Sequence, residues 1–313
     1  MTEYENVTVI GAGDMGHGFV VHFAAHGLSP TLLDHRQSNL DEARERIADV
    51  VDLLDRTGVA SLEADDVLEE TTFTLETDAA VADADLVLET VPEDLETKQS
   101  VFREVAAAAP ADAVLASNTS GIPVTDIGAA IPDAADRLAG CHWWNPPYLL
   151  TPVEVVAGKE TTDETVDRVA SFLESVDRDP IRVEKDVPGF VWNRVQFAVF
   201  RECLHLLEAG VASADDINRA IRDGYATRTA VIGPFETIDV NGIDLVRTVA
   251  EDLVPELSNT KEPSPVLDEY LDRGHTGVAS GRGFFTYDRP AEEVIADRDA
   301  DIAAVQRSLR DEE

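Results

Sequence analysis

The sequence predicts an α/β protein with a doubly wound, mainly parallel sheet, followed by a smaller all-helical domain. Over the first ~185 residues, short apolar β-branched runs alternate with helical patterns, as in parallel strands joined by helices. From Gly189 onward only helical patterns occur. The two regions meet at Asp186-Val187-Pro188, where proline disfavours a continuous helix. We therefore expect domains at residues 1–186 and 187–313.

The expected strands are short apolar runs, at 6–10, 30–34, 72–75, 85–89, 113–117, 138–142 and 153–156. The expected helices of the first domain have apolar residues at helical spacing, at 14–27, 39–57, 97–108, 124–130 and 162–175. The segment 36–70 is long for a simple connection and is interpreted as two helices joined near Thr57-Gly58. The helices of the second domain are expected at 190–210, 213–223, 234–253, 265–273 and 297–309.

Length and composition limit the class of protein. The chain has 313 residues, enough for two domains with cores of their own. No apolar run reaches the ~18 residues of a membrane span. The acidic start, Met1 to Glu5, lacks the regions of a signal peptide, so a cytoplasmic location is expected. The two cysteines, Cys141 and Cys203, are too few for a disulfide scaffold, and no clustered ligand set predicts a metal.

The net charge of −37 is extreme, and the acids are spread along the whole chain. Only four lysines occur, at positions 98, 159, 185 and 261. The apolar patterns between the acids are intact, which a disordered chain would lack. We interpret the charge as a surface adaptation to high salt, where screening suppresses self-repulsion. It argues against nucleic-acid partners, which bind basic surfaces.

A glycine-rich turn follows the first expected strand. The run Val7–Ile10 leads into Gly-x-Gly-x-x-Gly, and a helical pattern follows. This is the context in which a Rossmann-type domain binds a dinucleotide. Gly11 allows the tight turn, Gly13 lets the backbone approach the phosphates, and Gly16 lets the helix pack on the strand.

Charged and polar side chains follow the next expected strands, at the edge where α/β sheets bind ligands. Asp34 ends the second strand, where a carboxylate accepts hydrogen bonds from the ribose of NAD; the alternative is a helix cap. Lys98 follows Glu89-Thr90-Val91-Pro92-Glu93 and is placed to reach a cofactor, or forms a surface ion pair. The segment Ser117–Gly121 offers small hydroxyl and amide groups to a ligand, or forms a local turn.

A histidine and a glutamate make the candidate catalytic pair. His142 ends an expected strand, and Pro146-Pro147 forces a turn that can bring Glu154 back beside it. A carboxylate fixes the tautomer of such a histidine and stabilises its imidazolium, which suits it as a general base. A buried structural histidine is the alternative. Asn193 lies at the start of the helical domain, facing the junction, or serves in capping or packing.

In this order, the motifs resemble those of the 3-hydroxyacyl-CoA dehydrogenase family over nearly the whole chain. The resemblance rests on the glycine-rich turn with Met15, Glu89–Glu93 with Lys98, Ser117-Asn118-Thr119-Ser120, His142 with Asn145-Pro146, Val153-Glu154-Val155, Pro188–Arg194, Gly233-Pro234-Phe235-Glu236 and Gly281–Phe285.

The resemblance implies a role for each matching residue. His142 would take the proton from the 3-hydroxyl of the substrate, with Glu154 orienting it and stabilising its charge. Ser120 and Asn193 would hydrogen-bond the substrate oxygen while hydride passes to NAD. The implied cofactor-binding residues are Gly11, Gly13, Met15, Gly16, Asp34, Glu93, Lys98 and Asn145. The helical domain would supply a homodimer interface.

The chain departs from the family pattern where the substrate is concerned. Acyl-CoA members often carry lysines in the helical pair after the second strand, whereas residues 36–70 have Arg44, Arg46 and Arg56 but no lysine. General depletion of lysine is the alternative explanation. Trp143-Trp144 replaces the usual Phe-Phe, and Val278-Ala279 stands where a lysine usually contacts NAD.

The segment 224–232 is longer than in typical acyl-CoA enzymes. It is similar to the branch that acts on free hydroxy acids, such as L-gulonate 3-dehydrogenase (lambda-crystallin-like) and carnitine dehydrogenase. Arg228 would then bind a substrate carboxylate, or is a surface arginine.

The favoured activity is reversible, NAD-dependent oxidation of an L-3-hydroxyacyl-CoA to the 3-oxoacyl-CoA, as in fatty acid metabolism. The alternative is a dehydrogenase of a free 3-hydroxy carboxylic acid. A non-catalytic NAD-binding structural protein is a third hypothesis, disfavoured because His142 and Glu154 both stand at the family spacing.

Overall fold

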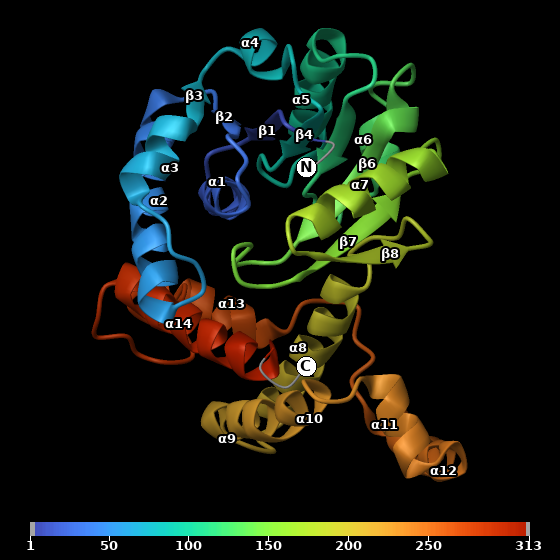
Figure 1. Cartoon of the computed structure of the whole chain (residues 1–313). Coiled ribbons are helices and arrows are strands. Elements are labelled where there is room, and N and C mark those ends of the chain that lie inside the picture. Colours follow the sequence, from blue (N-terminus) through green and yellow to red (C-terminus); the bar gives the residue numbers. More distant parts are fainter. Residues whose placement is uncertain (1–3, 311–313) are drawn as a thin grey trace. The chain divides into compact units, whose positions relative to one another are not determined.

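The computed structural model describes residues 4–310 (Figure 1). It divides into two compact units, one made of the residues up to Asn193 together with Asp299–Arg310, the other of Arg194–Arg298. The division thus falls slightly after the boundary expected at 186/187, and the end of the chain's last helix belongs to the first unit. Residues 1–3, which bear on the signal-peptide expectation, lie outside the described residues.

The first unit is built on a sheet whose strands run in the order β3-β2-β1-β4-β5-β6-β7-β8. All neighbouring strands are parallel except β6 and β7. This confirms the doubly wound, mainly parallel sheet. The strands are β1 (Val7–Ile10), β2 (Thr31–Leu33), β3 (Thr72–Thr74), β4 (Leu86–Glu89), β5 (Val114–Ser117), β6 (Leu138–Trp143), β7 (Pro152–Ala157) and β8 (Asp179–Val183).

Helices cover both faces of this sheet (Figure 1). The helices of the first unit are α1 (Gly16–Ala25), α2 (Gln37–Thr57), α3 (Ala64–Glu70), α4 (Thr77–Val81), α5 (Leu95–Ala108), α6 (Val124–Gly128), η1 (Ala135–Arg137) and α7 (Asp163–Ser175). Side chains of α1, α2 and α7 share one core with Val9 and Leu32, and those of α4, α5 and α6 share a second core with Ile10 and Leu33. Successive strand residues point to opposite faces, so the central strands are buried on both sides and read as continuous apolar runs.

Most expected elements of the first unit are present, with a few differences. The two helices expected in 36–70 are confirmed as α2 and α3, and α2 ends at Thr57, followed by Gly58 with a φ of 68°. Strand β8 and the short helix α4 were not expected. β8 is an edge strand of mostly exposed residues with Pro180 inside it, so it lacks the apolar run that identifies the others.

The second unit is helical. Its elements are α8 (Trp192–Glu208), which begins in the first unit, α9 (Ala214–Arg219), the π-helix η2 (Ala220–Ala226), α10 (Thr227–Thr229), α11 (Pro234–Asn241), α12 (Ile243–Leu253), η3 (Val254–Glu256), α13 (Pro265–Asp272), η4 (Val278–Ser280) and α14 (Ala291–Arg310), which ends in the first unit. The single helix expected at 234–253 is interrupted at Gly242, whose φ is 92°. No residue of 194–298 is buried. Among residues 4–310, no helix combines the length and apolar character needed to cross a membrane.

Candidate active site

The glycine-rich turn leaves room for a ligand at the carboxyl edge of the sheet. Gly11 has a φ of 108°, and a Cβ there would lie 2.7 Å from the carbonyl oxygen of Thr90. A Cβ on Gly16 would lie 1.9 Å from the carbonyl oxygen of Gly11, so these two glycines are required by the turn itself. A Cβ on Gly13 would meet nothing within 4 Å. Gly13 therefore faces open space at the start of α1, as a dinucleotide pyrophosphate requires.

Asp34 supports this turn from the end of β2. Its side chain is 6% exposed, and its Oδ2 accepts a hydrogen bond of 2.9 Å from the backbone N–H of Ala12. Its Oδ1 accepts from the backbone N–H of Arg36 and the side chain of Asn39. The carboxylate thus joins the turn to the start of α2. The expected contact with the ribose stays a prediction.

His142 and Glu154 lie opposite each other in the antiparallel pair of β6 and β7. The Nδ1 of His142 lies 2.7 Å from Oε2 of Glu154, and both side chains are buried. Because an ionised carboxylate only accepts hydrogen bonds, the proton of the neutral imidazole is placed on Nδ1, which leaves Nε2 as the acceptor. The pair therefore has the tautomer that a general base needs.

The other oxygen of Glu154 is held by the chain at the start of α8. Oε1 accepts hydrogen bonds from the backbone N–H of Val191, at 2.7 Å, and of Trp192, at 3.0 Å. Burial raises the pKa of the Glu154 carboxyl, but the hydrogen bonds from His142 and from these two backbone groups outweigh it and lower that pKa. Glu154 stays ionised beside His142.

Ser120 and Asn193 come together at the same edge. The Nδ2 of Asn193 donates a 2.7 Å hydrogen bond to the carbonyl oxygen of Ser120. The loop that carries Ser120 is ordered by Glu93, whose Oε1 accepts from the hydroxyl of Thr119 and from the backbone N–H of Ser120 and Gly121. Burial raises the pKa of Glu93, but the hydrogen bond from Thr119 and the charge of Lys98 outweigh it, so that pKa is lowered.

Lys98 is an internal residue rather than a surface one. Its side chain is 1% exposed, and Nζ lies 2.8 Å from Glu89 Oε1, 3.2 Å from the carbonyl oxygen of Val91 and 3.4 Å from Glu93 Oε2. Ser117 donates to the other oxygen of Glu89 at 2.6 Å. The three protons of the ammonium group therefore have three protein acceptors. The expected contacts of Lys98 and Glu93 with the cofactor stay predictions.

Three further residues of the expected set lie apart from this network. Met15 is partly buried against the core of the first unit, and Asn145 is exposed in the loop after β6. Arg228 is exposed in the second unit. Among the described residues its guanidinium has no hydrogen bond or ion pair.

Two features near the pair were not expected. Asn118 accepts a hydrogen bond from the backbone N–H of Trp143, at 2.8 Å, and so ties the loop after β5 to the end of β6. The rings of Trp144 and Trp192 stack with centroids 3.9 Å apart. Asn118 lies in a segment that the sequence singled out, whereas nothing in the sequence pairs the two tryptophans.

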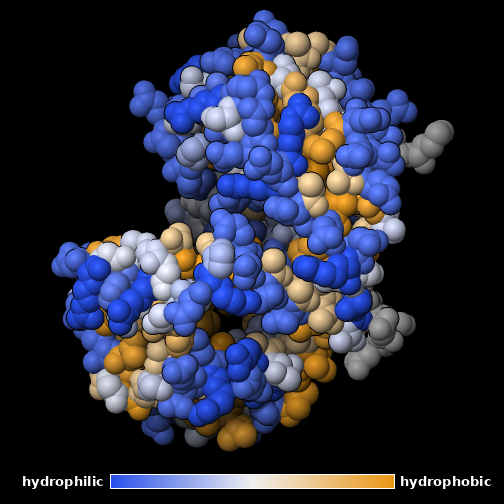
Figure 2. Space-filling model, turned by 90° about the vertical axis from the view of Figure 1, so that its left-hand side faces the viewer, coloured by the Kyte–Doolittle hydropathy of each residue, from blue (hydrophilic) through white to orange (hydrophobic). Residues whose placement is uncertain are grey.

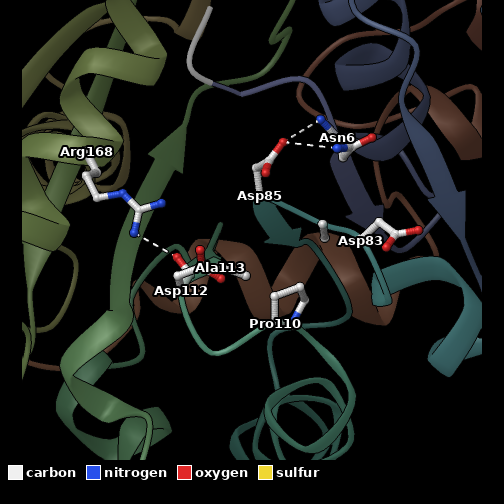
Figure 3. Close-up of a pocket in the computed structure, with 8 residues that line it drawn as sticks. Asn6, Asp83, Asp85, Pro110, Asp112, Ala113 and Arg168 are labelled. Atoms are coloured by element: carbon white, nitrogen blue, oxygen red, sulfur yellow. Dashed lines mark hydrogen bonds between the residues drawn. The ribbon is translucent and has the colours of Figure 1, made fainter.

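The structure also contains a cavity of about 490 Å³ at the opposite edge of the sheet. Figure 3 shows Asn6 and Asp85 on one side of it. On the other side, Arg168 donates a hydrogen bond to the carbonyl oxygen of Asp112. Apart from Arg168 of α7, the residues that line the cavity precede β1, β4 and β5, whereas His142 and the glycine-rich turn lie at the carboxyl ends of the strands. In the described part of the chain, no group of three or more His, Cys, Asp or Glu side chains is arranged to hold a metal ion.

A doubly wound sheet with an open glycine-rich turn and a buried His–Glu pair at the same edge defines a dinucleotide-binding dehydrogenase. Residues 6–187 match the model of the 3-hydroxyacyl-CoA dehydrogenase NAD-binding domain, and residues 189–287 match the model of its C-terminal domain. The chain belongs to the 3-hydroxyacyl-CoA dehydrogenase family. It is an NAD-dependent oxidoreductase that acts on CH–OH groups, which confirms the expected family, cofactor and class of enzyme.

Relatives match the chain from end to end. It is 35% identical to 5-formyl-3-hydroxy-2-methylpyridine 4-carboxylate 5-dehydrogenase of Mesorhizobium japonicum, over 98% of this chain and 99% of the relative. It is also 35% identical to L-carnitine dehydrogenase of Streptomyces coelicolor, over 98% of this chain and 96% of the relative.

Solved structures of members of this family have the same fold as the chain. One of a 5-formyl-3-hydroxy-2-methylpyridine 4-carboxylic acid 5-dehydrogenase, described as an NAD⁺-dependent dismutase, has a TM-score of 0.90 at 34% identity and covers 99% of both chains. That of (S)-3-hydroxybutyryl-CoA dehydrogenase from Ralstonia eutropha has a TM-score of 0.73 at 28% identity, over 92% of this chain and 100% of the other.

Proposed function

We propose that this enzyme is a dehydrogenase of a free hydroxy carboxylic acid. The observation that carries the proposal is the likeness, over nearly the full length, to relatives whose names denote free carboxylates, carnitine and a pyridine carboxylate. The acyl-CoA substrate that the sequence favoured is the second candidate, supported by the family itself and by the acyl-CoA enzymes among the solved structures.

The His142–Glu154 pair supports the proton chemistry of this reaction. Nε2 of His142 takes the proton of the substrate hydroxyl as the C–O bond becomes C=O. Glu154, 2.7 Å from Nδ1, stabilises the imidazolium that forms. NAD supplies the hydride acceptor when it is bound. Ser120 and Asn193 hold the substrate oxygen, and the hydrogen bond between them fixes the loop on which Ser120 stands.

The turn and the strand ends fit the cofactor. The open space at Gly13 would admit the pyrophosphate, and the backbone N–H groups at the start of α1 would bind it. Asp34 would bind the ribose, and Glu93, Lys98, Asn145 and Met15 would complete the site.

The arginines of α2 bear on the choice of substrate. Arg44 lies 3.5 Å above the ring of Phe73, Arg46 pairs with Asp14 at 2.7 Å, and Arg56 pairs with Asp52 at 3.8 Å. Each of these cations thus already has a protein partner, with which a phosphate of CoA would compete. In contrast, Arg228 has no such partner among the described residues. Its planar guanidinium suits a carboxylate, which it binds in bidentate fashion.

The test is a substrate panel in high salt. We compare L-3-hydroxybutyryl-CoA with free L-3-hydroxybutyrate, L-gulonate, carnitine and the pyridine carboxylate of the Mesorhizobium relative. Turnover is expected with a free acid. Arg228→Met is expected to raise the KM for that acid about 10- to 100-fold, the value of one charge-assisted contact, and Arg222→Met serves as control because Arg222 pairs with Asp223. Turnover of the CoA thioester alone, unchanged in Arg228→Met, would establish the second candidate instead.

We also propose that the enzyme is a homodimer formed through the helical unit. Large apolar side chains are exposed along α8, α11 and α12, and the apolar surface of this unit is visible in Figure 2. Phe197 is 63% exposed and Phe235 81%. Exposed apolar patches of this kind mark an interface with another protein. In a symmetric dimer, a second copy of the chain would cover this patch with its own equivalent apolar patch. Light scattering after gel filtration in high salt is expected to give the mass of two chains, and a monomer at micromolar concentration would contradict the proposal.

A further inference from the structure

The loop that joins β6 to β7 connects the two members of the catalytic pair. It begins after Trp143, carries Asn145 at an exposed position and returns to β7, on which Glu154 stands. Unlike Asn145, the residues Pro146 to Leu149 are buried. The loop therefore presents one exposed polar side chain on a buried base.

Residues from three distant parts of the first unit contact this base. The guanidinium of Arg178 donates a 3.0 Å hydrogen bond to the carbonyl oxygen of Pro147. Gly18 of α1 lies so close that a Cβ there would be 2.7 Å from Cγ of Pro147. The hydroxyl of Tyr148 donates a 2.6 Å hydrogen bond to Oδ2 of Asp299.

Asp299 is the contact that the sequence gives no reason to expect. It stands on α14, 151 positions along the chain from Tyr148, and its side chain is 1% exposed. The end of α14 packs on the first unit, because Ala303 is fully buried in the core of that unit and Ala300 and Ile302 pack against it. An apolar residue at position 299 would continue this packing face, since residues three and four apart share a face of a helix. A buried carboxylate is costly unless it is hydrogen-bonded, so its presence there points to the bond with Tyr148.

We propose that Asp299 is a positioning residue of the active site: through Tyr148 it fixes the loop that presents Asn145, so that the end of α14 sets the geometry at the catalytic pair. The role of Asn145 rests on the proposed function, whereas the position of the loop does not. An acid on the last helix thereby acts on the reaction without touching substrate or cofactor.

The tryptophans of the chain report on the conformation of this loop. The three tryptophans are Trp143, at the end of β6, Trp144, the first residue of the loop, and Trp192, which stacks on Trp144. Intrinsic fluorescence and the circular dichroism of the stacked indoles therefore report on the loop, whether or not the substrate has been identified.

The experiment compares Asp299→Leu, Asp299→Asn, Tyr148→Phe and the double variant Tyr148→Phe/Asp299→Leu in the full-length protein. Asp301→Asn is the matched control, since Asp301 is an exposed acid on the same helix. For each variant we measure the unfolding temperature, the tryptophan signals, NADH binding by fluorescence, and kcat with KM.

Asp299→Leu and Tyr148→Phe are expected to change the tryptophan signals and to lower kcat at least about tenfold, because small displacements at a reacting centre are costly. Asp299→Asn keeps an acceptor for the Tyr148 hydroxyl and is expected to stay within about threefold of the parent, as is Asp301→Asn. In the double variant neither member of the Tyr148–Asp299 hydrogen bond remains to be left unpaired by loss of the other, so the unfolding temperature is expected to lie above that of either single variant, while kcat and the tryptophan signals stay altered.

Two results would overturn the proposal. If kcat recovers together with the unfolding temperature in the double variant, the bond only stabilises the fold. If the tryptophan signals of Asp299→Leu and Tyr148→Phe equal those of the parent, the loop does not depend on the bond. A failure of the proposed function is distinguishable, because it would remove turnover from the parent as well and leave the fluorescence comparison intact.

Discussion

Replacing Glu154 with glutamine is expected to reduce turnover more than the loss of one charge suggests. The two oxygens of Glu154 face three donors, the Nδ1–H of His142 and the backbone N–H groups of Val191 and Trp192. Glutamine has one oxygen and one NH₂ group, so it can accept a hydrogen bond on one side only. On the other side its NH₂ group would face an N–H donor of the protein. Either the histidine loses its tautomer or the start of α8 loses its acceptor.

The magnitude follows from the distance. At 2.7 Å between Nδ1 and Oε2, and with an effective dielectric constant of about 20, the imidazolium and the carboxylate attract each other by about 6 kcal/mol. The remaining amide oxygen retains part of this, so we expect a loss of about 4 kcal/mol in the transition state, or about 10³-fold in kcat. The Asp of a Ser-His-Asp triad, which holds its histidine in the same manner, is worth about 10⁴-fold.

The assay is steady-state kinetics with the substrate that the panel identifies, in high salt, with NADH binding measured in parallel. Glu154→Gln is expected to bind NADH like the parent, and His142→Gln is expected to lose at least about 10² in kcat. Glu184→Gln, an exposed acid, serves as the control. A Glu154→Gln enzyme that retains more than a tenth of the parent kcat would refute the reasoning.

Three further predictions follow from the fold. Gly13→Ala is expected to keep its unfolding temperature but to bind NADH at least about tenfold more weakly, because its Cβ enters the open space proposed for the pyrophosphate. Gly16→Ala should fail to fold. Normal NADH affinity in Gly13→Ala would contradict the first of these predictions. Burial and the charge of Arg178 hold the pKa of His22 well below its usual value. Below pH ~6.5 only the unfolded state then takes up a proton at His22, so the free energy of unfolding should fall by up to about 1.4 kcal/mol per pH unit as the pH drops. In His22→Gln this fall should be smaller. Equilibrium denaturation measures both slopes, and equal slopes in the parent and the variant would contradict the prediction. Removal of salt is expected to lower the unfolding temperature followed by circular dichroism, and an unchanged melt in dilute buffer would refute the adaptation to salt.

The sequence predicts the sheet well because each central strand is an apolar run followed by a polar residue. Glu89 and Ser117 show this, since both end buried strands and both are buried themselves. Such a pattern is set by local chemistry. Strand β8 is not predicted because most of its residues are exposed, and the break at Gly242 is not predicted because a glycine inside a helical pattern is often tolerated.

The partners of charged groups are harder to predict than their positions. Lys98 was expected beside a cofactor, and the structure places its ammonium group on Glu89, Val91 and Glu93. The sequence shows that a cation follows the strand, but the direction of its side chain depends on atoms brought together by the whole sheet. The return of α14 to the first unit is of the same kind, because an apolar face predicts that a helix is covered and does not say by what.

Three acids of the site share one physical role, which separates them from the acids of the surface. Asp34, Glu93 and Glu154 each accept hydrogen bonds from backbone N–H groups, at the glycine-rich turn, at the Ser120 loop and at the start of α8. These are the chain segments that bring cofactor and substrate residues together, and their N–H groups have no partner in a strand or helix. The pKa of Glu93 and that of Glu154 are both lowered in the folded protein. Their contribution to stability is therefore complete above the unfolded value of ~4.3 and is lost only as the pH falls through the lowered folded value. These two carboxylates should thus keep their hydrogen bonds in mild acid, where proton uptake by His22 in the unfolded state already weakens the fold, so that acid unfolding begins in the packing of α1 rather than at these carboxylates.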